Sequence, residues 1–435
     1  MIAYIDPTDT AFGAIGDGVA DDTSAIQFVV ADGRPVHWGG PTRKYRITDT
    51  IRAELKTALI WRSDGAEFLF DAPTSRREAF AILTAGHRVV VDGPLHLNAG
   101  MKAFIGFLFE NLTNYAADID LHRLSIENIY RASTAFTGGD GCWIRGSWRN
   151  VYVERFSAHN MVMAAGTGQQ AVCGIFGLSI SRNGSGYPQS VRVTHPHIDN
   201  VYCEDADYRF DQDGLRVMTF DPASKTVLPD EGSLFVDGGT FRNCRGRSIK
   251  SQCDATTVVG AKFIRSLANS TGVGNPEIDI QVGGGNVSGI DFTYSNSVPD
   301  CLVFFSGSYV SGKRMTGGNV RGVNGQVSGS VVLPDLFVAS SKEGFLHTVN
   351  ITDVQTYTDG QIGRIMTFNP AGQCYLNLTN ISTGVESAGI RLLSGGSLTT
   401  TFRGVRNYRA ARPLLAGHVA NIDVQERDLA TTGWS

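Results

Sequence analysis

The chain has 435 residues, of which 42% are hydrophobic and 18% charged, so its composition excludes a disordered chain and favours an extensive core. Its net charge of −4 gives no basic footprint for nucleic acid, and no apolar run approaches the ~18 residues of a membrane-spanning helix. Glycine is abundant without a three-residue period, which excludes collagen. The excess of Gly, Asn, Ser, Thr and Val favours short strands joined by turns.

The N-terminal sequence and the cysteines indicate where the protein is made. The first six residues, MIAYID, lack the basic and apolar regions of a secretion signal, so we expect no signal peptide. The seven cysteines are an odd number and contain no CxxC pair. We therefore expect reduced, buried thiols in a protein made in a cytoplasm.

The segment 12–27, FGAIGDGVADDTSAIQ, predicts a Gly-rich turn followed by a short helix over residues 23–31. Asp21, Asp22 or Ser24 can cap the helix, and Gln27 follows Ser24 by three residues, as in a capping box. We expect the helix to cover the open end of a solenoid with an apolar stripe formed by Ile26, Val29 and Val30. The acids of this segment are therefore interpreted as structural.

From about residue 121, pairs of apolar residues five positions apart recur along the chain. The repeat predicts a unit of roughly 20 to 25 residues that buries its apolar side only by stacking on further copies. A parallel β-helix of about thirteen rungs fits this length best. The pairs include Leu121/Ile126, Val151/Phe156, Ile175/Ile180, Val193/Ile198, Leu215/Phe220, Val236/Phe241 and Val258/Phe263. Asparagines near the predicted strand ends are interpreted as stacked turn residues: Asn150, Asn200, Asn243, Asn296, Asn380 and Asn407.

The segment 12–27 closely resembles the N-terminal motif of the pectate-lyase-like superfamily. A second segment, CRGRSIKSQ over residues 244–252, resembles a strand of bacteriophage tailspikes within that superfamily. The resemblance implies an all-β, right-handed, single-stranded parallel β-helix with a short N-terminal capping helix, and a polysaccharide substrate. A polygalacturonase mechanism is not implied, because the paired-Asp and Gly-His-Gly motifs of those enzymes are missing.

Three regions are expected on this basis. Residues 1–40 form the N-terminal cap, with its Gly-rich turn and short helix. Residues 41–310 form the main parallel β-helix, which carries the active site. Residues 311–435 form C-terminal β-helical rungs or a trimerisation region.

Acidic residues are concentrated between Asp199 and Asp237, where ten lie within 39 residues. Crowded carboxylates repel one another, and such a cost is typical of functional sites. Acids at matching positions on neighbouring rungs lie ~4.8 or ~9.6 Å apart, close to the separations that glycoside hydrolysis needs. The candidate catalytic residues are Asp211, Asp213, Glu204 and Asp205, with the last two placed one coil earlier. The candidate substrate-binding residues are Tyr208, Arg216, Glu231, Arg247 and Lys250.

Two alternatives to this site stay open. Asp211, Glu231 and Asp254 occupy nearly equal offsets before three successive anchors, so Glu231 and Asp254 could carry the chemistry instead. The stretch 203–213 could also be an ordinary solvated acidic loop. The sequence Asp211-Gln-Asp213-Gly214 does not complete a calcium loop, and we expect neither a metal nor another cofactor.

The function expected is that of a tailspike-like endo-depolymerase, which hydrolyses a bacterial capsule, exopolysaccharide or O-antigen with paired carboxylates. One alternative is a polysaccharide lyase, in which Arg247 or Lys250 neutralises a uronate while a Lys, His or Tyr removes the C5 proton. Another is a receptor-binding spike without turnover. The resemblance implies a homotrimer in a phage virion, attached through a tail or baseplate protein, with no nucleic-acid or membrane partner.

Overall fold

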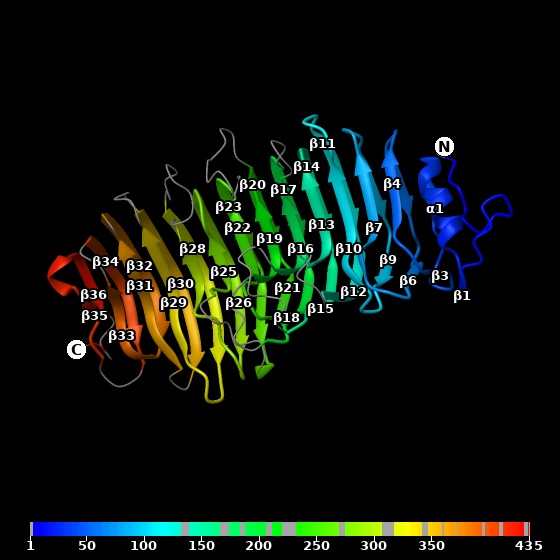
Figure 1. Cartoon of the computed structure of the whole chain (residues 1–435). Helices are drawn as coiled ribbons and strands as arrows, with labels where there is room; N and C mark the ends of the chain where they lie inside the picture. Colours follow the sequence, from blue (N-terminus) through cyan, green and yellow to red (C-terminus); the bar gives the residue numbers. More distant parts are fainter. Residues whose placement is uncertain are drawn as a thin grey trace. The chain divides into compact units, whose positions relative to one another are not determined.

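The computed structural model describes residues 3–131, 139–165, 174–182, 188–205, 211–219, 232–268, 275–306, 317–341, 347–358, 361–370, 372–393, 396–408, 412–429 and 434. The chain divides into an N-terminal unit, residues 1–219, and a C-terminal unit, residues 220–435. Strands make up 65% and helix 4% of the structure, and the described strand pairs are parallel. The predicted parallel β-helix with one N-terminal helix is therefore confirmed (Figure 1).

In the N-terminal unit, each complete rung contributes two strands to one sheet, called sheet I, and one strand to a second, called sheet II. Sheet I contains β1 (Asp17–Asp21), β2 (Val36–His37), β3 (Lys44–Ile47), β5 (Leu59–Arg62), β6 (Glu67–Phe70), β8 (Val89–Asp92), β9 (Leu95–Asn98), β11 (Ala117–His122), β12 (Leu124–Arg131), β14 (Trp148–Glu154), β15 (Ser157–Met163), β17 (Ser190–Thr194) and β18 (His197–Cys203). Sheet II contains β4 (Ile51–Leu55), β7 (Arg76–Thr84), β10 (Ala103–Asn111), β13 (Gly139–Gly146), β16 (Ile175–Ser181) and β19 (Gln212–Met218).

The C-terminal unit starts with the same arrangement in β20 to β24, but from β26 on each rung contributes one long strand to sheet I, and β26 pairs with both β23 and β24. Its sheet I contains β20 (Ser233–Asp237), β21 (Thr240–Cys244), β23 (Ala255–Val259), β24 (Lys262–Arg265), β26 (Gly284–Tyr294), β28 (Gly317–Val327), β30 (His347–Thr358), β32 (Gln373–Thr383), β34 (Ser397–Asn407) and β36 (Ile422–Leu429). Its sheet II contains β22 (Ile249–Gln252), β25 (Ile278–Ile280), β27 (Cys301–Phe305), β29 (Leu333–Ser341), β31 (Ile362–Pro370), β33 (Val385–Leu392) and β35 (Leu415–Gly417). A short 3-10 helix, η2 (Val419–Asn421), precedes β36.

The rungs are less regular in length than the sequence pattern suggested. Val236 lies opposite Val258, 22 residues later, whereas Val151 lies opposite Val191, 40 residues later. The pair Ile175/Ile180 lies on β16 of sheet II, so it belongs to the rung already marked by Val151. Sheet II nevertheless has thirteen strands in the described chain, the predicted number of rungs. The two numbers agree because two errors in the prediction offset each other. The sequence pattern counted some sheet II strands as separate rungs, and it missed the rungs before residue 121.

The N-terminal helix α1 (Thr23–Asp32) lies against β4 at the end of the N-terminal unit. Its stripe is buried as predicted, with Ile26, Val29 and Val30 almost fully covered. Asp21 accepts a hydrogen bond from the backbone N–H of Thr23 at 3.0 Å. Asp22 turns the other way and accepts from the backbone N–H groups of Ile15 and Gly16, so it fixes the Gly-rich turn. The structural interpretation of these two acids is thus confirmed.

The expected capping box is absent at α1. The amide of Gln27 donates to the carbonyl of Arg52 at 2.6 Å and accepts from the N–H of the same residue at 2.9 Å. Gln27 therefore completes the backbone hydrogen bonding of β4, because an edge strand leaves such groups unpaired. A local sequence pattern could not distinguish this long-range partner from a capping role.

Of the six predicted positions, Asn200 belongs to a stack of asparagines in the N-terminal unit. Asn128, Asn160 and Asn200 have positive φ angles, and successive amides bond at 2.8 and 3.3 Å. Asparagine tolerates this left-handed backbone because its short polar side chain bonds locally. The remaining predicted positions also make structural hydrogen bonds: Asn150 to Asp118, Asn243 to the N–H of Ser266, Asn296 to the carbonyl of Ser266, Asn380 to Asp353, and Asn407 to the N–H of Val385.

Six of the seven cysteines lie in the described chain, and all six are buried thiols. Burial raises the pKa of the Cys142 and Cys301 thiols well above the usual value. Cys173 lies outside the described residues. Within the described chain, no helix has both the length and the apolar character needed to cross a membrane.

Candidate functional site

An acidic column runs across sheet II of the N-terminal unit. In successive strands from β7 to β19, Glu78 lies opposite Ile105, which lies opposite Asp140. Asp140 lies opposite Phe176, which lies opposite Asp213. Acidic and apolar residues thus alternate, and each acid is separated from the next by two rungs, or ~9.6 Å. We call these five residues the acidic column.

Glycines follow the column residues and bring the strands close together. Each of Gly106, Gly141 and Gly177 faces the backbone carbonyl of the glycine on the next strand. A Cβ atom at Gly141 would lie 2.5 Å from the carbonyl oxygen of Gly177, which is closer than real Cβ contacts. The chain therefore needs glycine here to hold the column residues in register.

Asp140 is a member of the column whose charge is strongly disfavoured. Its side chain is completely buried, and neither carboxyl oxygen has a hydrogen bond of normal geometry within the described chain. Burial raises the pKa of Asp140 from 3.8 to about 7, although Arg216, the Ser179 hydroxyl and Arg131 act in the opposite direction. Asp140 therefore holds a proton near neutral pH, as a general acid must.

Arg216 lies on β19 beside the column. Its guanidinium group stands 3.7 Å from the centre of the Phe176 ring, a close cation–π contact. Its Nε and Nη2 atoms donate to the Ser179 hydroxyl at 3.2 and 2.8 Å. Ser179 and Arg216 lie directly opposite each other on β16 and β19. These contacts fix a positive charge next to Phe176, the residue that separates Asp140 from Asp213.

A second row on the same sheet combines aromatic and charged side chains. Trp143 donates its indole N–H to the Ser181 hydroxyl at 2.8 Å, and the Arg145 guanidinium lies 5.0 Å from the Trp143 ring centre. Arg145 also approaches Glu110 at 3.4 Å, while 30% of its side chain stays exposed. Trp143 forms a small apolar cluster with Ile105 and Leu108. This row places a partly exposed cation and an aromatic ring beside the column.

Glu78 ends the column at β7. Burial raises its pKa, and the repulsion from Glu110 acts in the same direction, while Arg77 and Arg52 oppose the shift. The Arg77 Nε lies 3.3 Å from a Glu78 carboxyl oxygen, and 36% of the Arg77 side chain is exposed. Glu78 is therefore a second buried acid whose pKa is raised by burial.

The structure separates the four predicted catalytic acids. Asp213 is completely buried within β19, whereas Asp211 directly precedes that strand and is only half-buried. Glu204 is exposed after β18, where it accepts a hydrogen bond from the Tyr130 hydroxyl at 3.3 Å. Asp205 follows, with its backbone N–H 3.4 Å from the Cys203 sulfur. The placement of Glu204 and Asp205 one coil earlier is wrong, since β18 and β19 belong to the same rung.

The predicted binding residues are distributed over both units. Arg216 lies beside the acidic column, whereas Arg247 and Lys250 lie in the C-terminal unit. The Arg247 Nε forms an ion pair of 2.8 Å with Asp279, and Lys250 lies opposite Asp279 on β22 and β25. Tyr208 and Glu231 lie outside the described residues, and the alternative acid Asp254 is exposed.

Asp140 was missed because it lies far outside the acid-rich stretch. A signal for it exists in the sequence, since Asp140-Gly141 and Asp213-Gly214 are each followed by an apolar residue and a larger side chain. The same spacing recurs at Ile105-Gly106 and Phe176-Gly177. Aligning these glycines would have placed both acids in one column. No group of three or more metal-ligating side chains occurs within the described ranges.

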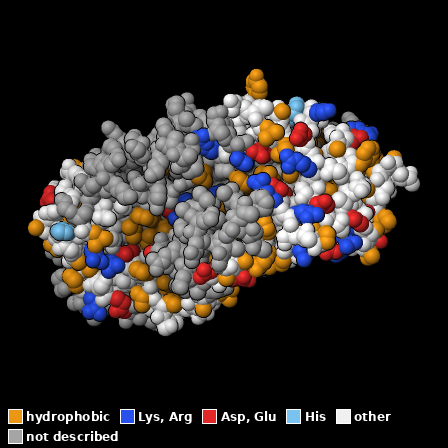
Figure 2. All heavy atoms as spheres, viewed as in Figure 1, with side chains coloured by type: hydrophobic (Ala, Val, Ile, Leu, Met, Phe, Trp, Pro, Cys, Tyr) orange, Lys and Arg blue, Asp and Glu red, His pale blue; other side chains and the backbone are white. Residues whose placement is uncertain are grey.

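On the face of the molecule in Figure 2, basic and acidic side chains are intermixed over the described surface. A large surface patch of basic side chains alone, which would attract nucleic acid, is not visible on this face. The arrangement agrees with the small net charge of −4.

No protein-family model matches this sequence, and no curated protein matches it. Among solved structures, it is similar to PfbA, a surface adhesin of Streptococcus pneumoniae, with a TM-score of 0.50 and 10% identity over 98% of this chain and 92% of that one. A GH87 α-1,3-glucanase from Streptomyces thermodiastaticus gives a TM-score of 0.45 and 13% identity over 100% of this chain and 69% of that one. The tailspike protein of Acinetobacter baumannii phage AM24 gives a TM-score of 0.29 and 12% identity over 85% of this chain and 54% of that one. At these identities, the likeness to PfbA shows a shared parallel β-helix fold, and the activity has to be argued from the residues.

Proposed function

We propose that this protein is a polysaccharide depolymerase that hydrolyses glycosidic bonds in a bacterial surface glycan. One observation carries the proposal: Asp140 and Asp213 are buried at matching positions of sheet II, two rungs apart, and the pKa of Asp140 is about 7. Glycoside hydrolysis needs such a pair of carboxyl groups, of which one is protonated.

The two acids take different roles in this proposal. Asp140 donates its proton to the glycosidic oxygen, and the bond between that oxygen and the anomeric carbon breaks. Asp213 accepts a proton from a water molecule whose oxygen bonds to the anomeric carbon from the opposite face. The backbone separation of ~9.6 Å over two rungs lies near the ~6.5–9.5 Å of inverting enzymes and well above the ~5–5.5 Å of retaining ones. We therefore propose inversion.

The neighbouring residues support substrate binding. Arg216 is held beside the column by Ser179 and Phe176, so its charge can bind a sugar hydroxyl or carboxylate without reorganising. Trp143 is buried and supports the partly exposed Arg145, which can pair with an acidic glycan. Glu204 and Asp211 are more exposed, and we assign them to substrate contact.

A lyase that acts on a uronate is the second candidate, and the placement of Arg247 and Lys250 near Asp279 favours it. Two buried or half-buried cations on one sheet could neutralise the uronate carboxylate. A lyase product contains an unsaturated uronate that absorbs ultraviolet light, whereas a hydrolase product has a new reducing end without this absorbance. A receptor-binding spike without turnover would give neither product.

The deciding experiment is to incubate the protein with purified capsule, exopolysaccharide and lipopolysaccharide from candidate host bacteria. We expect fragments whose mass includes one added water per cleavage, and an inverted anomeric configuration in the first NMR spectra. Fragments without added water, with activity lost in Arg247→Ala or Lys250→Ala, would establish the lyase instead. Intact polymer with retained binding would establish the non-catalytic spike.

We further propose that three chains assemble in a phage virion and attach through a tail or baseplate protein. Gly-rich, weakly charged segments such as 283–290 would be protected from further association when packed between copies. Light scattering should then give about three times the chain mass of 46.8 kDa. A uniform monomer at micromolar concentration would contradict this assembly.

A further inference from the structure

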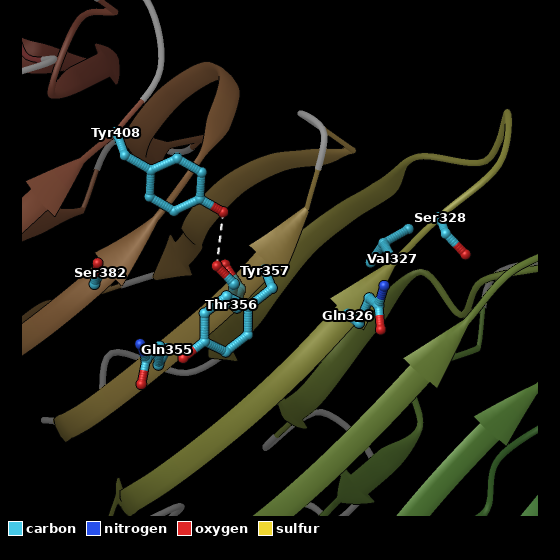
Figure 3. A pocket seen from close by; sticks show the side chains of 8 residues that line it. All are labelled: Gln326, Val327, Ser328, Gln355, Thr356, Tyr357, Ser382 and Tyr408. Carbon is cyan, nitrogen blue, oxygen red and sulfur yellow. Dashed lines mark hydrogen bonds between the residues drawn. The ribbon is translucent and has the colours of Figure 1, made fainter.

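A cavity of about 410 Å³ lies in the C-terminal unit, far along the sequence from the acidic column. Figure 3 shows its lining side chains, which come from β28, β30 and β32 together with Tyr408 just after β34. The volume falls within the ~300–1,000 Å³ of ordinary small-ligand sites. The lining residues are Gln326, Val327, Ser328, Gln355, Thr356, Tyr357, Ser382 and Tyr408.

Two tyrosines present their rings at this cavity. Tyr357 is 61% exposed and Tyr408 is 44% exposed, which is unusual for aromatic side chains. Strand alternation explains Tyr357, because Val354 and Thr356 are buried while Gln355 and Tyr357 point outward. The Tyr408 hydroxyl donates to the carbonyl of Thr356 at 2.6 Å (Figure 3), which fixes its ring before any ligand binds.

The polar groups of the cavity are uncharged and available. Gln326 lies opposite Tyr357, and Gln355 lies opposite Ser382, so both amides stand at the cavity on neighbouring strands. Neither amide side chain has a hydrogen-bond partner within the described ranges. Each offers both donors and an acceptor. None of the eight described lining residues carries a charge, so these residues provide no counter-ion for a phosphate or a carboxylate.

This combination is chemically specific. A pyranose ring presents C–H groups that pack on an aromatic face and hydroxyl groups that both donate and accept hydrogen bonds. The fixed Tyr408 ring and the exposed Tyr357 ring, beside unpartnered amides, match both features, because tyrosine joins an apolar face to a polar tip. Lipid chains lack the dense, paired donors and acceptors that this cavity would satisfy.

We propose that this cavity, the tyrosine site, binds a neutral saccharide without cleaving it. Acidic side chains are absent among the described residues that line it, so these residues offer no carboxyl pair for hydrolysis. The site would hold the glycan chain on the protein between catalytic events. The proposal does not depend on hydrolysis at the acidic column, since an adhesive protein without turnover could use the same site.

Affinity electrophoresis tests this with the full chain and gels that contain one polymer each. The neutral polymers are dextran, pullulan, laminarin and barley β-glucan, and the acidic ones are alginate and hyaluronate. We expect at least one neutral polymer to retard the wild-type protein, and Tyr357→Ala to lower its affinity at least tenfold. Tyr115→Ala is the matched control, because Tyr115 is 78% exposed in the N-terminal unit and does not line the cavity.

Two further variants separate the site from folding and from catalysis. Gln355→Ala removes an exposed amide without touching the core, so it should also weaken retardation while thermal unfolding stays unchanged. Asp140→Asn should leave retardation unchanged even if it abolishes turnover. The inference is overturned if no neutral polymer retards the protein, if only acidic polymers do so, or if Tyr357→Ala and Tyr115→Ala bind equally well.

Discussion

The two units differ in the surroundings of a buried acid. In the C-terminal unit, Glu277 is almost fully buried and lies 2.7 Å from the Arg265 guanidinium, which is itself inaccessible. The Tyr294 hydroxyl donates to the same carboxylate at 3.3 Å. In the N-terminal unit, Asp140 is equally buried, but its pKa lies near 7 because burial outweighs the neighbouring cations.

This difference distinguishes an acid with a structural role from an acid with a catalytic role. A buried acid bonded to a buried arginine has one stable state, and its removal leaves the other charge uncompensated. A buried acid whose pKa lies near the working pH can gain or lose a proton, which is the requirement for general acid catalysis. The comparison therefore assigns a structural role to Glu277 and a catalytic one to Asp140. Four predictions test this assignment, from the largest expected effect to the smallest.

Asp140→Asn and Asp213→Asn should each lower turnover of the surface polysaccharide by ~10²-fold or more, because they remove the acid and the base. Release of new reducing ends measures the effect. Glu277→Gln is the matched control, and its turnover per folded molecule should stay near the wild-type value. Full activity in both aspartate variants would move the site, most directly towards Glu204 and Asp211.

Glu277→Gln should lower the free energy of unfolding by about 3–5 kcal/mol, because it leaves the Arg265 charge buried without its partner. Urea unfolding followed by circular dichroism measures this change. A loss below about 1 kcal/mol would show that the pair does not hold the C-terminal unit together. Asp140→Asn should show no such loss at pH 5, since the side chain that it replaces is protonated and uncharged there.

The stability of the N-terminal unit should depend on the Asp140 proton. The unfolded chain releases this proton near its ordinary pKa of 3.8, whereas the folded chain keeps it until about pH 7. Stability should therefore fall as pH rises from about 4 to about 7 and level off above, by at most about 4 kcal/mol from this group. Turnover should also fall above about pH 7, as the acid loses its proton.

Urea unfolding at pH 5 and pH 8 checks this dependence. The difference between the two pH values should be smaller in Asp140→Asn than in the wild type, because asparagine does not titrate. An identical difference in both proteins would place the Asp140 pKa in its ordinary range.

Asp21→Asn should have the smallest effect. Asp21 holds the start of α1 through Thr23 and bonds the Thr48 hydroxyl at 2.7 Å, and both contacts lower its pKa. Asparagine keeps an acceptor oxygen there, so we expect a loss below about 1 kcal/mol. Thermal unfolding measures it, and turnover should be unchanged. A loss of activity in this variant would contradict the structural role of the cap.

The sequence by itself determined the fold class and the structural role of the N-terminal helix α1 and of the acids before it. The buried stripe of α1 and the asparagine turns follow from local rules, because a capping acid or a turn asparagine bonds within a few residues or at one fixed stacking position. The motif over residues 12–27 and the apolar repeat were therefore sufficient to predict a parallel β-helix. They were not sufficient to determine rung length, which varies with the connections between strands.

The tertiary structure decided which acids meet. Asp140 and Asp213 are 73 positions apart in the sequence, and only the register from β13 through β16 to β19 places them in one column. The number of acidic residues per length of sequence is highest at 199–237, and the site was predicted there because this measure considers only neighbours along the chain. In a solenoid, however, the neighbours that set a pKa also lie on other rungs, as Ser179 and Arg216 do for Asp140. The site therefore depends on register, which a local pattern does not contain.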